Sequence, residues 1–549
     1  GVGFAIAPTD EDFSINSTLL EFLKQEFNID IRGLDGALQG LKISEILAMV
    51  RMEIVNMKDW EVFDDVYVAA FSFARYQMWQ DLRRNMDEFS KNELISSLLN
   101  NRCEIKDTKD VELKEDECPV TQTLMPLWAD SSQWEAVALS QTGKTFVLHG
   151  PPGTGKTTTL VEAIYETLHR ESQVLVCAQS NMAVDWISEK LTDRGVAVLR
   201  VGNPSRVNDK MLSFTYERRF EAHPSYPSLW AIRKAIRDLY TYRPSSGREA
   251  FHQKVARLRD RATELEIAIN ESLFNEARVI ACTLAGSANR VLAGKKFPTL
   301  FIDEAAQALE ASCWIAIQKA GRVILAGDHR QLPPTVKCPE ALKGGLDRTL
   351  METIAARHPS AVSLLRTQYR MNDAIMRFSS ECFYDGKVES APEVKYRGIL
   401  DWDTPMEWID TADEEQTAPY LTEAPSGAVC APALPTVEVP DFGETRNPDS
   451  TSRSNPEEAR LTLNILKAYF QKIGKERILA ERIDTGIISP YKGQVQLLRA
   501  LLRRDAFFKP YRHLLSVNTV DGFQGQERDV ILILSLIHIS EPTRHAQIS

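Results

Sequence analysis

A glycine-rich segment at residues 150–158 has residue types and spacing suited to binding phosphate. It matches the pattern G-x-x-x-x-G-K-[ST]. In such a loop the glycines let backbone N–H groups approach phosphate oxygens, the lysine supplies a positive charge, and the next hydroxyl can ligate magnesium. The predicted nucleotide-binding residues of the loop are Gly150, Pro151, Pro152, Gly153, Thr154, Gly155, Lys156, Thr157 and Thr158. The alternative is a glycine-rich turn that only precedes a helix.

A nucleotide-hydrolysing site also needs carboxylates that hold a metal ion and activate water. Asp303 and Glu304 follow the apolar run 299–302 directly. We expect Asp303 to hold Mg²⁺ together with Thr157, and Glu304 to act as the general base. A pair of carboxylates after a strand does not by itself indicate a catalytic site. The pair indicates one here because a phosphate loop lies upstream.

Two further polar segments are candidates for sensing or stabilising charge on a phosphate. Gln331 lies in the segment 327–335, after another apolar run, and Arg370 lies in the segment 365–372. An arginine supplied by a second domain can stabilise the transition state of phosphoryl transfer. The alternatives are a capped loop for the first segment and a surface ion pair for the second.

Short apolar runs place these residues at the ends of predicted β-strands. The runs occupy residues 145–149, 174–178, 197–201, 279–283, 299–302, 323–326, 485–488 and 530–534. Longer stretches with helical spacing, such as 160–168, separate them. Apolar strands separated by helices are typical of parallel sheets covered on both faces. We therefore expect an α/β fold in which the phosphate loop joins a strand to a helix.

The order of the motifs resembles that of the superfamily 1B helicases of the up-frameshift, senataxin and immunoglobulin-mu-binding-protein type. The matching positions are Gln133, the phosphate loop, and residues 178–185, 281–283, 303–307, 327–334, 368–371, 489–491 and 517–527. The resemblance covers residues 129 to about 535. It implies two RecA-like P-loop domains with parallel sheets and with ATP bound at their interface.

The resemblance also implies a role for each matching residue. Gln133 would contact the adenine edge, Tyr369 would stack on the adenine, and Gln331 would sense the γ-phosphate. Arg370 would act as the arginine finger and Glu527 would contact the nucleotide. The positions where this family contacts a single-stranded backbone are Ser180, Asn181, Thr283, Pro334 and Thr519. Members of the family translocate 5′ to 3′ on single-stranded DNA or RNA and unwind duplexes.

The charge of the chain is unevenly distributed. Its 549 residues include 65 basic and 76 acidic ones, and the net charge of −11 by itself argues against a nucleic-acid partner. Residues 1–128 hold 13 basic and 24 acidic side chains, and residues 401–460 hold 3 and 14. The rest of the chain therefore has a balance of +11, which suits a polyanionic partner.

Residues 216–261 combine eleven basic and five acidic side chains with seven aromatic ones. Aromatic platforms beside basic groups are used to bind single-stranded nucleic acid. The alternative is a solvated helical hairpin whose aromatic residues form its own core. The sequence leaves both interpretations open.

We predict the following domain organisation. An acidic, mainly helical domain occupies residues 1–118, where the family usually has a β-barrel. This domain resembles a region of other bacterial helicase-like proteins. Either a natural fusion or an artificial join would explain its presence here. A first RecA-like domain follows at 119–360, with a helical insertion at about 205–275. A second, incomplete one follows at 361–535, with a disordered acidic Pro-rich insertion at about 411–456. Residues 536–549 resemble a translated sequencing adapter and are expected to be non-native.

We expect an ATP-dependent nucleic-acid helicase or translocase that uses ATP and Mg²⁺, binds single-stranded DNA or RNA, and acts as a monomer. The last helicase motif, which carries a second arginine finger, is not found in the sequence, so we expect weak hydrolysis. One alternative is a nucleic-acid-binding ATPase switch that does not unwind. Another is a chimeric or truncated fragment that binds ATP but is catalytically weak.

Two features bear on the location of the protein. The longest near-continuous apolar run, at residues 530–539, is about half of what a membrane-spanning helix needs. The eight cysteines form no C-x-x-C pair and have no histidine at zinc-ligand spacing. We expect reduced thiols in a cytoplasmic protein with no membrane partner.

Overall fold

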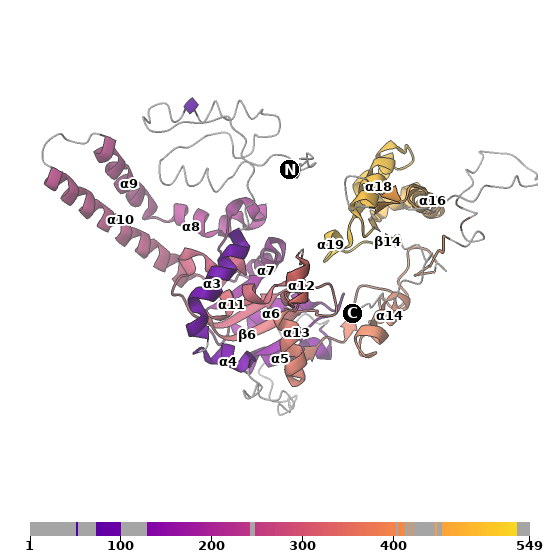
Figure 1. Ribbon diagram of the computed structural model, residues 1–549, viewed down its shortest axis with the longest axis horizontal. Helices are drawn as coiled ribbons and strands as arrows, with labels where there is room; N and C mark the ends of the chain where they lie inside the picture. The colour runs from indigo at the N-terminus through magenta and orange to yellow at the C-terminus, as the bar shows by residue number, and fades with distance from the viewer. Residues whose placement is uncertain are drawn as a thin grey trace, which may run out of the picture. The chain divides into compact units, whose positions relative to one another are not determined.

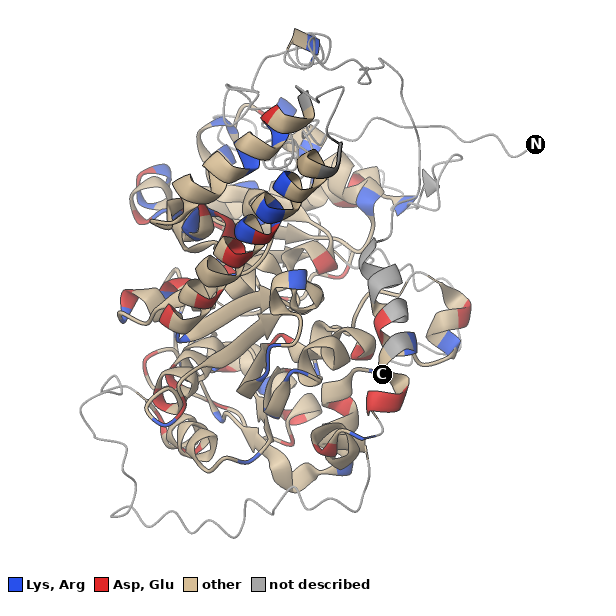
Figure 2. Ribbon diagram, turned by 90° about the vertical axis from the view of Figure 1, so that its left-hand side faces the viewer, with Lys and Arg blue, Asp and Glu red and all other residues tan. Residues whose placement is uncertain are grey.

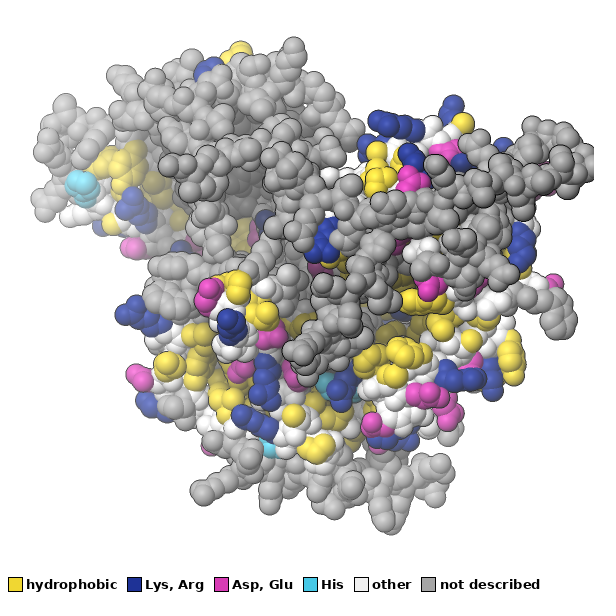
Figure 3. Space-filling model, turned by 45° about the vertical axis from the view of Figure 1, so that its right-hand side comes forward, with side chains coloured by type: hydrophobic (Ala, Val, Ile, Leu, Met, Phe, Trp, Pro, Cys, Tyr) yellow, Lys and Arg dark blue, Asp and Glu magenta, His cyan; other side chains and the backbone are white. Residues whose placement is uncertain are grey.

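The computed structural model divides into two compact units, residues 1–368 and 369–549, and each is described by itself. The structure describes residues 51–52, 73–89, 91–99, 129–241, 248–336, 338–401, 404–411, 417, 420, 445–446 and 453–534. Within these ranges, no helix is both long enough and apolar enough to cross a bilayer. Hydrophobic, basic and acidic side chains are interspersed over the described part of the face seen in Figure 3.

The first unit is built on a seven-stranded parallel sheet with the strand order β3-β4-β2-β5-β6-β1-β7. The strands are β1 (Phe146–His149), β2 (Val174–Ala178), β3 (Val198–Arg200), β4 (Val279–Thr283), β5 (Phe297–Asp303), β6 (Ala320–Gly327) and β7 (Val362–Leu364). Their residues are buried on both faces, as expected for continuous apolar runs in a parallel sheet. The predicted parallel α/β architecture is confirmed.

Helices cover both faces of this sheet, because successive side chains of a strand point to opposite sides. In β2, Val174 and Val176 belong to one apolar cluster, whereas Leu175 and Cys177 belong to the other. The first cluster includes helices α5 (Ser131–Gln141), α6 (Lys156–Thr167) and α7 (Asn181–Asp193). The second includes helices α4 (Glu93–Leu99), α10 (Arg248–Glu276), α11 (Glu310–Ile317) and α13 (Leu350–Arg357).

The helices of the N-terminal segment belong to the core of the first unit. Helix α3 (Phe73–Phe89) packs against α11, and the side chains of Leu94, Ile95 and Leu98 on α4 are buried in the second cluster. Gln318 Nε2 lies 3.2 Å from Asp81 Oδ2. A helical N-terminal segment is thus present at 73–99, but these helices share a core with residues beyond the predicted boundary at 118. The part of the predicted helical domain before residue 73 lies almost wholly outside the described residues.

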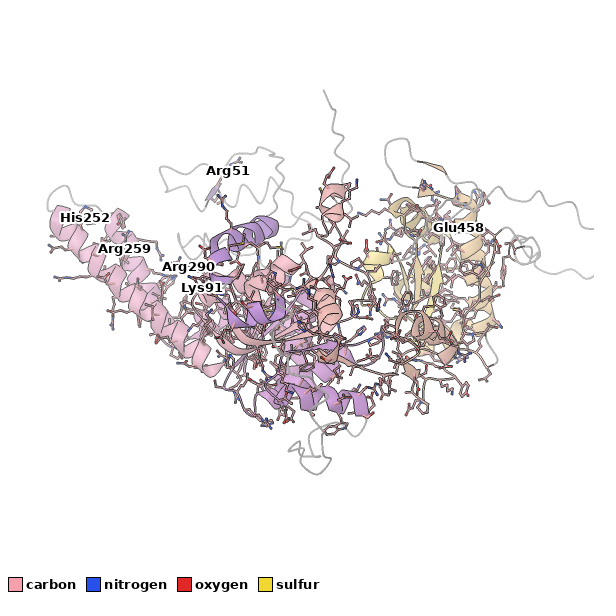
Figure 4. The ribbon with its side chains drawn as sticks, turned by 60° about the horizontal axis from the view of Figure 1, so that its bottom comes forward. Arg51, Lys91, His252, Arg259, Arg290 and Glu458 are labelled. Atoms are coloured by element: carbon pink, nitrogen blue, oxygen red, sulfur yellow. The ribbon has the colours of Figure 1, made fainter. Side chains whose placement is uncertain are left out.

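A long helical hairpin projects from the first unit (Figure 1). It consists of α9 (Tyr226–Thr241) and α10, which pack side by side, and it follows the short helix α8 (Tyr216–Ala222). His252 and Arg259 lie along α10 (Figure 4). The part of α10 from Arg248 to Arg261 carries all of its lysine and arginine residues, and the charged residues of the part from Glu264 to Glu276 are all acidic (Figure 2).

The second unit contains a three-stranded parallel sheet with the order β13-β12-β14. These strands are β12 (Thr485–Ile488), β13 (Leu515–Asn518) and β14 (Val530–Ile533). Its helices are α14 (Asp373–Phe383), α16 (Pro456–Ile473), α17 (Lys475–Glu481), α18 (Lys492–Arg504) and α19 (Val520–Phe523). The apolar faces of α16 and α18 pack with Ile487 and Val517 of the sheet in one cluster.

The boundary between the units lies later than the predicted position at residue 361. Strand β7 pairs with β1 in register Val147↔Val362, so residues 362–364 complete the first sheet. This three-residue strand is too short to be recognised by its composition. Most of the predicted Pro-rich insertion at 411–456 and the whole tail at 536–549 lie outside the described residues.

Candidate active site

The phosphate loop connects β1 to α6 in a conformation that only glycines adopt easily. Gly153 and Gly155 have φ of +76° and +72°, in the left-handed region. At Gly150 an added Cβ would lie 2.5 Å from Lys156 Cβ, so the backbone and Lys156 are packed too closely for any side chain. The hydroxyl of Thr154 closes the loop by donating to Pro151 O at 2.7 Å.

The start of α6 is open to an anion. Its N-cap is Gly155, and no side chain caps the helix. Its first backbone N–H groups therefore have no side-chain acceptor and stand at the positive end of the helix dipole. Thr157 and Thr158 lie in this first turn, and Pro152 lies in the loop before it. These features fit a polyphosphate.

Lys156 and Asp303 form an ion pair at the carboxyl end of the sheet. Lys156 Nζ lies 3.0 Å from Asp303 Oδ1, and the Asp303 side chain is only 2% exposed. Burial acts to lower the pKa of Lys156, but the charges of Asp303, Glu304 and Asp328 outweigh it and the pKa is raised. Lys156 therefore stays protonated, and the site concentrates negative charge around one partly buried ammonium.

Glu304 is held in an unusual environment next to this pair. Its φ is +54°, which is uncommon for a residue other than glycine. Burial and the neighbouring charge of Asp303 raise the pKa of its carboxyl, against the opposing effects of Lys156 and of a hydrogen bond from Ser180. A buried carboxyl with a raised pKa beside a phosphate loop suits a general base.

Gln133 is fixed against the phosphate loop from outside it. Asp130 caps α5 by accepting from the backbone N–H of Gln133 at 3.0 Å, and Gln133 Oε1 accepts from Asp130 N in return. Gln133 Nε2 then donates to Thr154 O at 3.0 Å. The side chain thus lies beside the loop, where a base could reach it.

Gln331 belongs to a cluster that the sequence did not reveal. Its Nε2 donates to Asp328 Oδ2 at 2.8 Å, and Asp328 Oδ1 lies 2.9 Å from His149 Nε2. His149 is the last residue of β1, directly before the phosphate loop. Burial, followed by the charge of nearby His149, lowers the pKa of His329 to about 4. Through these contacts Gln331, the predicted γ-phosphate sensor, is connected to β1, the strand directly before the phosphate loop.

The predicted nucleotide contacts of the second unit lie together. Arg370 forms an ion pair with Glu527, and Tyr369, which is 36% exposed, precedes Arg370 directly. In this unit, the two charged residues expected to serve the nucleotide face each other.

The predicted nucleic-acid contacts fall in both units. Ser180 and Asn181 follow β2 and Thr283 ends β4, which are neighbouring strands paired in register Ala178↔Thr283. Their side chains also serve the fold: Thr283 Oγ1 accepts from Gly286 N, and Asn181 Oδ1 accepts from Arg200 Nη2 at 2.9 Å. Pro334 lies in the loop after β6. Thr519 lies in the second unit, as the N-cap of α19.

Arg200 is a site-supporting residue that sequence reasoning missed. It is fully buried and also donates to Asp185 Oδ1 at 2.8 Å and to Val201 O at 2.7 Å. Asp185 Oδ2 accepts from Asn208 N at 2.9 Å. An arginine within the apolar run 197–201 was the one available hint, since a buried arginine needs a paired carboxylate.

The aromatic residues of 216–261 are divided between core and surface. Phe220 and Tyr226 pack against the second cluster of the first unit, and Phe251 is buried. Trp230 and Tyr240 are 38% and 44% exposed, with Lys234 and Arg259 over their rings at 5.5 and 5.7 Å. Within the described part of the hairpin, Trp230 and Tyr240 are the only aromatic residues whose rings are accessible and lie beside cations.

Comparisons with known proteins find two matching regions, which meet between residues 339 and 346, before the boundary of the compact units at residue 368. Two family models, each described as an AAA domain, match residues 129–339 and 346–547. The DNA-binding protein SMUBP-2 of Rattus norvegicus is 36% identical over 74% of this chain and 39% of its own length. An uncharacterized ATP-dependent helicase of Methanocaldococcus jannaschii is 31% identical over 71% and 60%, and the ATP-dependent helicase upf1 of Schizosaccharomyces pombe is 30% identical over 75% and 41%. The chain therefore spans between about two fifths and three fifths of the length of these relatives.

Proposed function

We propose that this chain, which belongs to the superfamily 1B helicases of the up-frameshift and SMUBP-2 type, is an ATP-dependent helicase or translocase acting on nucleic acid. The observation that carries the proposal is the ion pair between Lys156 of the phosphate loop and the buried Asp303, with Glu304 beside it. The names of the relatives point the same way, since they include a DNA-binding protein and two ATP-dependent helicases.

The geometry suggests how the first unit acts on its substrate. ATP bound with Mg²⁺ supplies the phosphoanhydride bond whose hydrolysis drives the cycle. The N–H groups of the loop bind phosphate oxygens, and Lys156 turns from Asp303 towards them. Asp303 and Thr157 would hold Mg²⁺, which would neutralise charge on the phosphates, and Glu304 takes a proton from the attacking water. Gln331, fixed by Asp328, senses the γ-phosphate.

The second unit and the strand ends complete the proposal. Tyr369 stacks on the adenine, Gln133 contacts its edge, Arg370 serves as the arginine finger, and Glu527 contacts the nucleotide. Ser180, Asn181, Thr283, Pro334 and Thr519 contact the backbone of a single strand of DNA or RNA. The proposed movement is 5′ to 3′, and the proposed form is a cytoplasmic monomer.

An ATPase assay tests this proposal. Steady-state hydrolysis is measured with and without single-stranded DNA or RNA, on the unmodified chain, on Glu304→Gln, and on Glu352→Gln, which replaces an exposed glutamate of α13. We expect stimulation by nucleic acid, at least about a 100-fold loss in Glu304→Gln, and no loss in Glu352→Gln. Full hydrolysis by Glu304→Gln would rule out the assigned base.

A strand-displacement assay separates a helicase from a switch. Displacement of a labelled strand that requires ATP hydrolysis supports unwinding. Nucleotide-dependent binding without any displacement supports the alternative, an ATPase switch that clamps nucleic acid.

A further inference from the structure

Ser180 and Glu304 meet because they follow neighbouring strands. Strands β2 and β5 pair in register Ala178↔Asp303, so the residues just beyond them lie at the same edge of the sheet. Ser180 Oγ lies 3.2 Å from Glu304 Oε2 and donates to it. Ser180 Oγ also accepts from Ala183 N at 3.1 Å and thereby caps α7.

The Ser180 hydroxyl has only one proton to give. A serine hydroxyl is a single donor with two acceptor lone pairs. The Ser180 oxygen accepts the N–H of Ala183, which caps α7, and its proton is directed at the carboxylate of Glu304. A phosphate oxygen of a bound strand offers only lone pairs, so it must compete with Glu304 for this proton.

We propose that Ser180 is a positioning residue that restrains Glu304 until a nucleic-acid phosphate takes its hydroxyl proton. The inference rests on the proposed function, in which Glu304 is the base and Ser180 contacts the backbone. It explains physically how a bound strand would accelerate hydrolysis: the strand removes a hydrogen bond from the carboxylate that accepts the proton of water.

The start of α7 is held so firmly that the hydroxyl, and not the helix, must move. The buried Arg200 donates to Asn181 and Asp185, on the first two turns of α7. Asp185 in turn accepts from Asn208 N. Rotation of the Ser180 hydroxyl about its Cβ–Oγ bond redirects the proton without moving Oγ, so the bond from Ala183 N and the bonds of Arg200 all remain.

Release changes the chemistry of Glu304 in the direction that hydrolysis needs. A hydrogen bond donated to a carboxylate favours its charged form and makes it a weaker base. Losing the bond from Ser180 therefore leaves Oε2 of Glu304, which lies 3.2 Å from Ser180 Oγ, available to the attacking water.

The test compares hydrolysis rates with and without a single-stranded oligonucleotide, measured in single turnover with enzyme in excess so that slow rates are resolved. Ser180→Ala is expected to raise the rate without oligonucleotide at least about tenfold, the lower end of the range expected for one hydrogen bond to a charged group, and to reduce the stimulation ratio towards one. Ser180→Thr keeps the hydroxyl and should retain the stimulation by oligonucleotide that Ser180→Ala loses.

Two further variants separate positioning from stability. Ser188→Ala removes another buried hydroxyl of α7, one that donates to Val184 O, and should leave both rates unchanged. Ser180→Gly lacks the hydroxyl but keeps a residue that is tolerated at an N-cap, so it repeats the test if Ser180→Ala unfolds.

The outcomes distinguish this inference from the proposed function. Undiminished stimulation in both Ser180→Ala and Ser180→Gly overturns the inference and leaves the function intact. A loss of both basal and stimulated rates in these variants also overturns it, because Ser180 would then orient Glu304 rather than restrain it. If the unmodified chain hydrolyses no ATP, or Glu304→Gln hydrolyses it fully, the proposed function fails and the inference fails with it.

Discussion

At the scale of single residues, the site holds charged groups at positions where their burial destabilises the fold. Asp303 is 2% exposed and depends on Lys156 for its stability as a charged group. Glu304 combines a left-handed backbone with a buried carboxyl. Strain and desolvation of this kind persist where the surrounding structure enforces them, and they cluster at functional sites.

Glu304→Gln is expected to stabilise the fold while it removes activity. The pKa of Glu304 is raised in the folded chain, first by burial and then by Asp303, so the folded state binds the proton more tightly than the unfolded state does. Ionisation of Glu304 therefore opposes folding above the raised pKa, and this penalty vanishes below the ordinary glutamate value of about 4.3. Thermal unfolding should show a higher midpoint for Glu304→Gln at pH 7.5 and a shrinking difference towards pH 4.5. An unchanged midpoint at pH 7.5 would contradict this account.

Gly150→Ala should damage the phosphate loop through a clash alone. The added Cβ would meet Lys156 Cβ at 2.5 Å and Cγ at 2.6 Å, atoms too close to the backbone to yield. We expect nucleotide affinity to fall at least about tenfold, because a displaced Lys156 no longer reaches phosphate. Fluorescent-nucleotide titration measures this, with Gly398→Ala as the control, since its Cβ would meet only Leu400 O at 3.4 Å. Equal affinities in the two variants would argue against the clash.

At the scale of elements, local features of the chain could be predicted from the sequence, whereas contacts between segments that folding brings together could not. The strand 174–178 and the order of strand, glycine-rich loop and helix around residues 150–158 were predicted correctly, because glycine spacing and apolar runs are local properties. Strand β7 was missed because three residues carry too little periodicity. The contact between Arg200 and Asn181 could not be predicted, because it joins residues nineteen positions apart through the pairing of separate elements.

Helix α4 gives a test of whether the N-terminal segment is part of the first unit. Leu98 is fully buried in its core, whereas the adjacent Leu99 is 42% exposed. Leu98→Ala should lower the free energy of unfolding by about 2–5 kcal/mol, through lost burial and the cavity left behind. Leu99→Ala should change it by less than about 1 kcal/mol. Denaturant unfolding compares the two, and equal effects would mean that α4 does not pack as described.

At the scale of the whole molecule, the net charge hides two opposite tendencies. The acidic residues are concentrated in 1–128 and 401–460, and the remainder of the chain is basic. The basic part includes the hairpin half from Arg248 to Arg261. A polyanion bound by the basic part would be repelled by acidic segments of the same chain within a Debye length.

Neutralising the acidic insertion is therefore expected to strengthen single-strand binding at low salt. Residues 421–444 contain four acidic residues and no basic one, namely Glu423, Glu438, Asp441 and Glu444. Replacing all four by their amides should raise oligonucleotide affinity about twofold to fivefold at 50 mM salt, and the gain should disappear near 300 mM because salt screens the repulsion. Fluorescence anisotropy at both salt concentrations measures this. Deleting 421–444 should give a similar gain if charge alone is responsible. A gain from deletion but not from the amides would show that the insertion excludes the strand by its bulk, and no gain from either would remove the electrostatic argument.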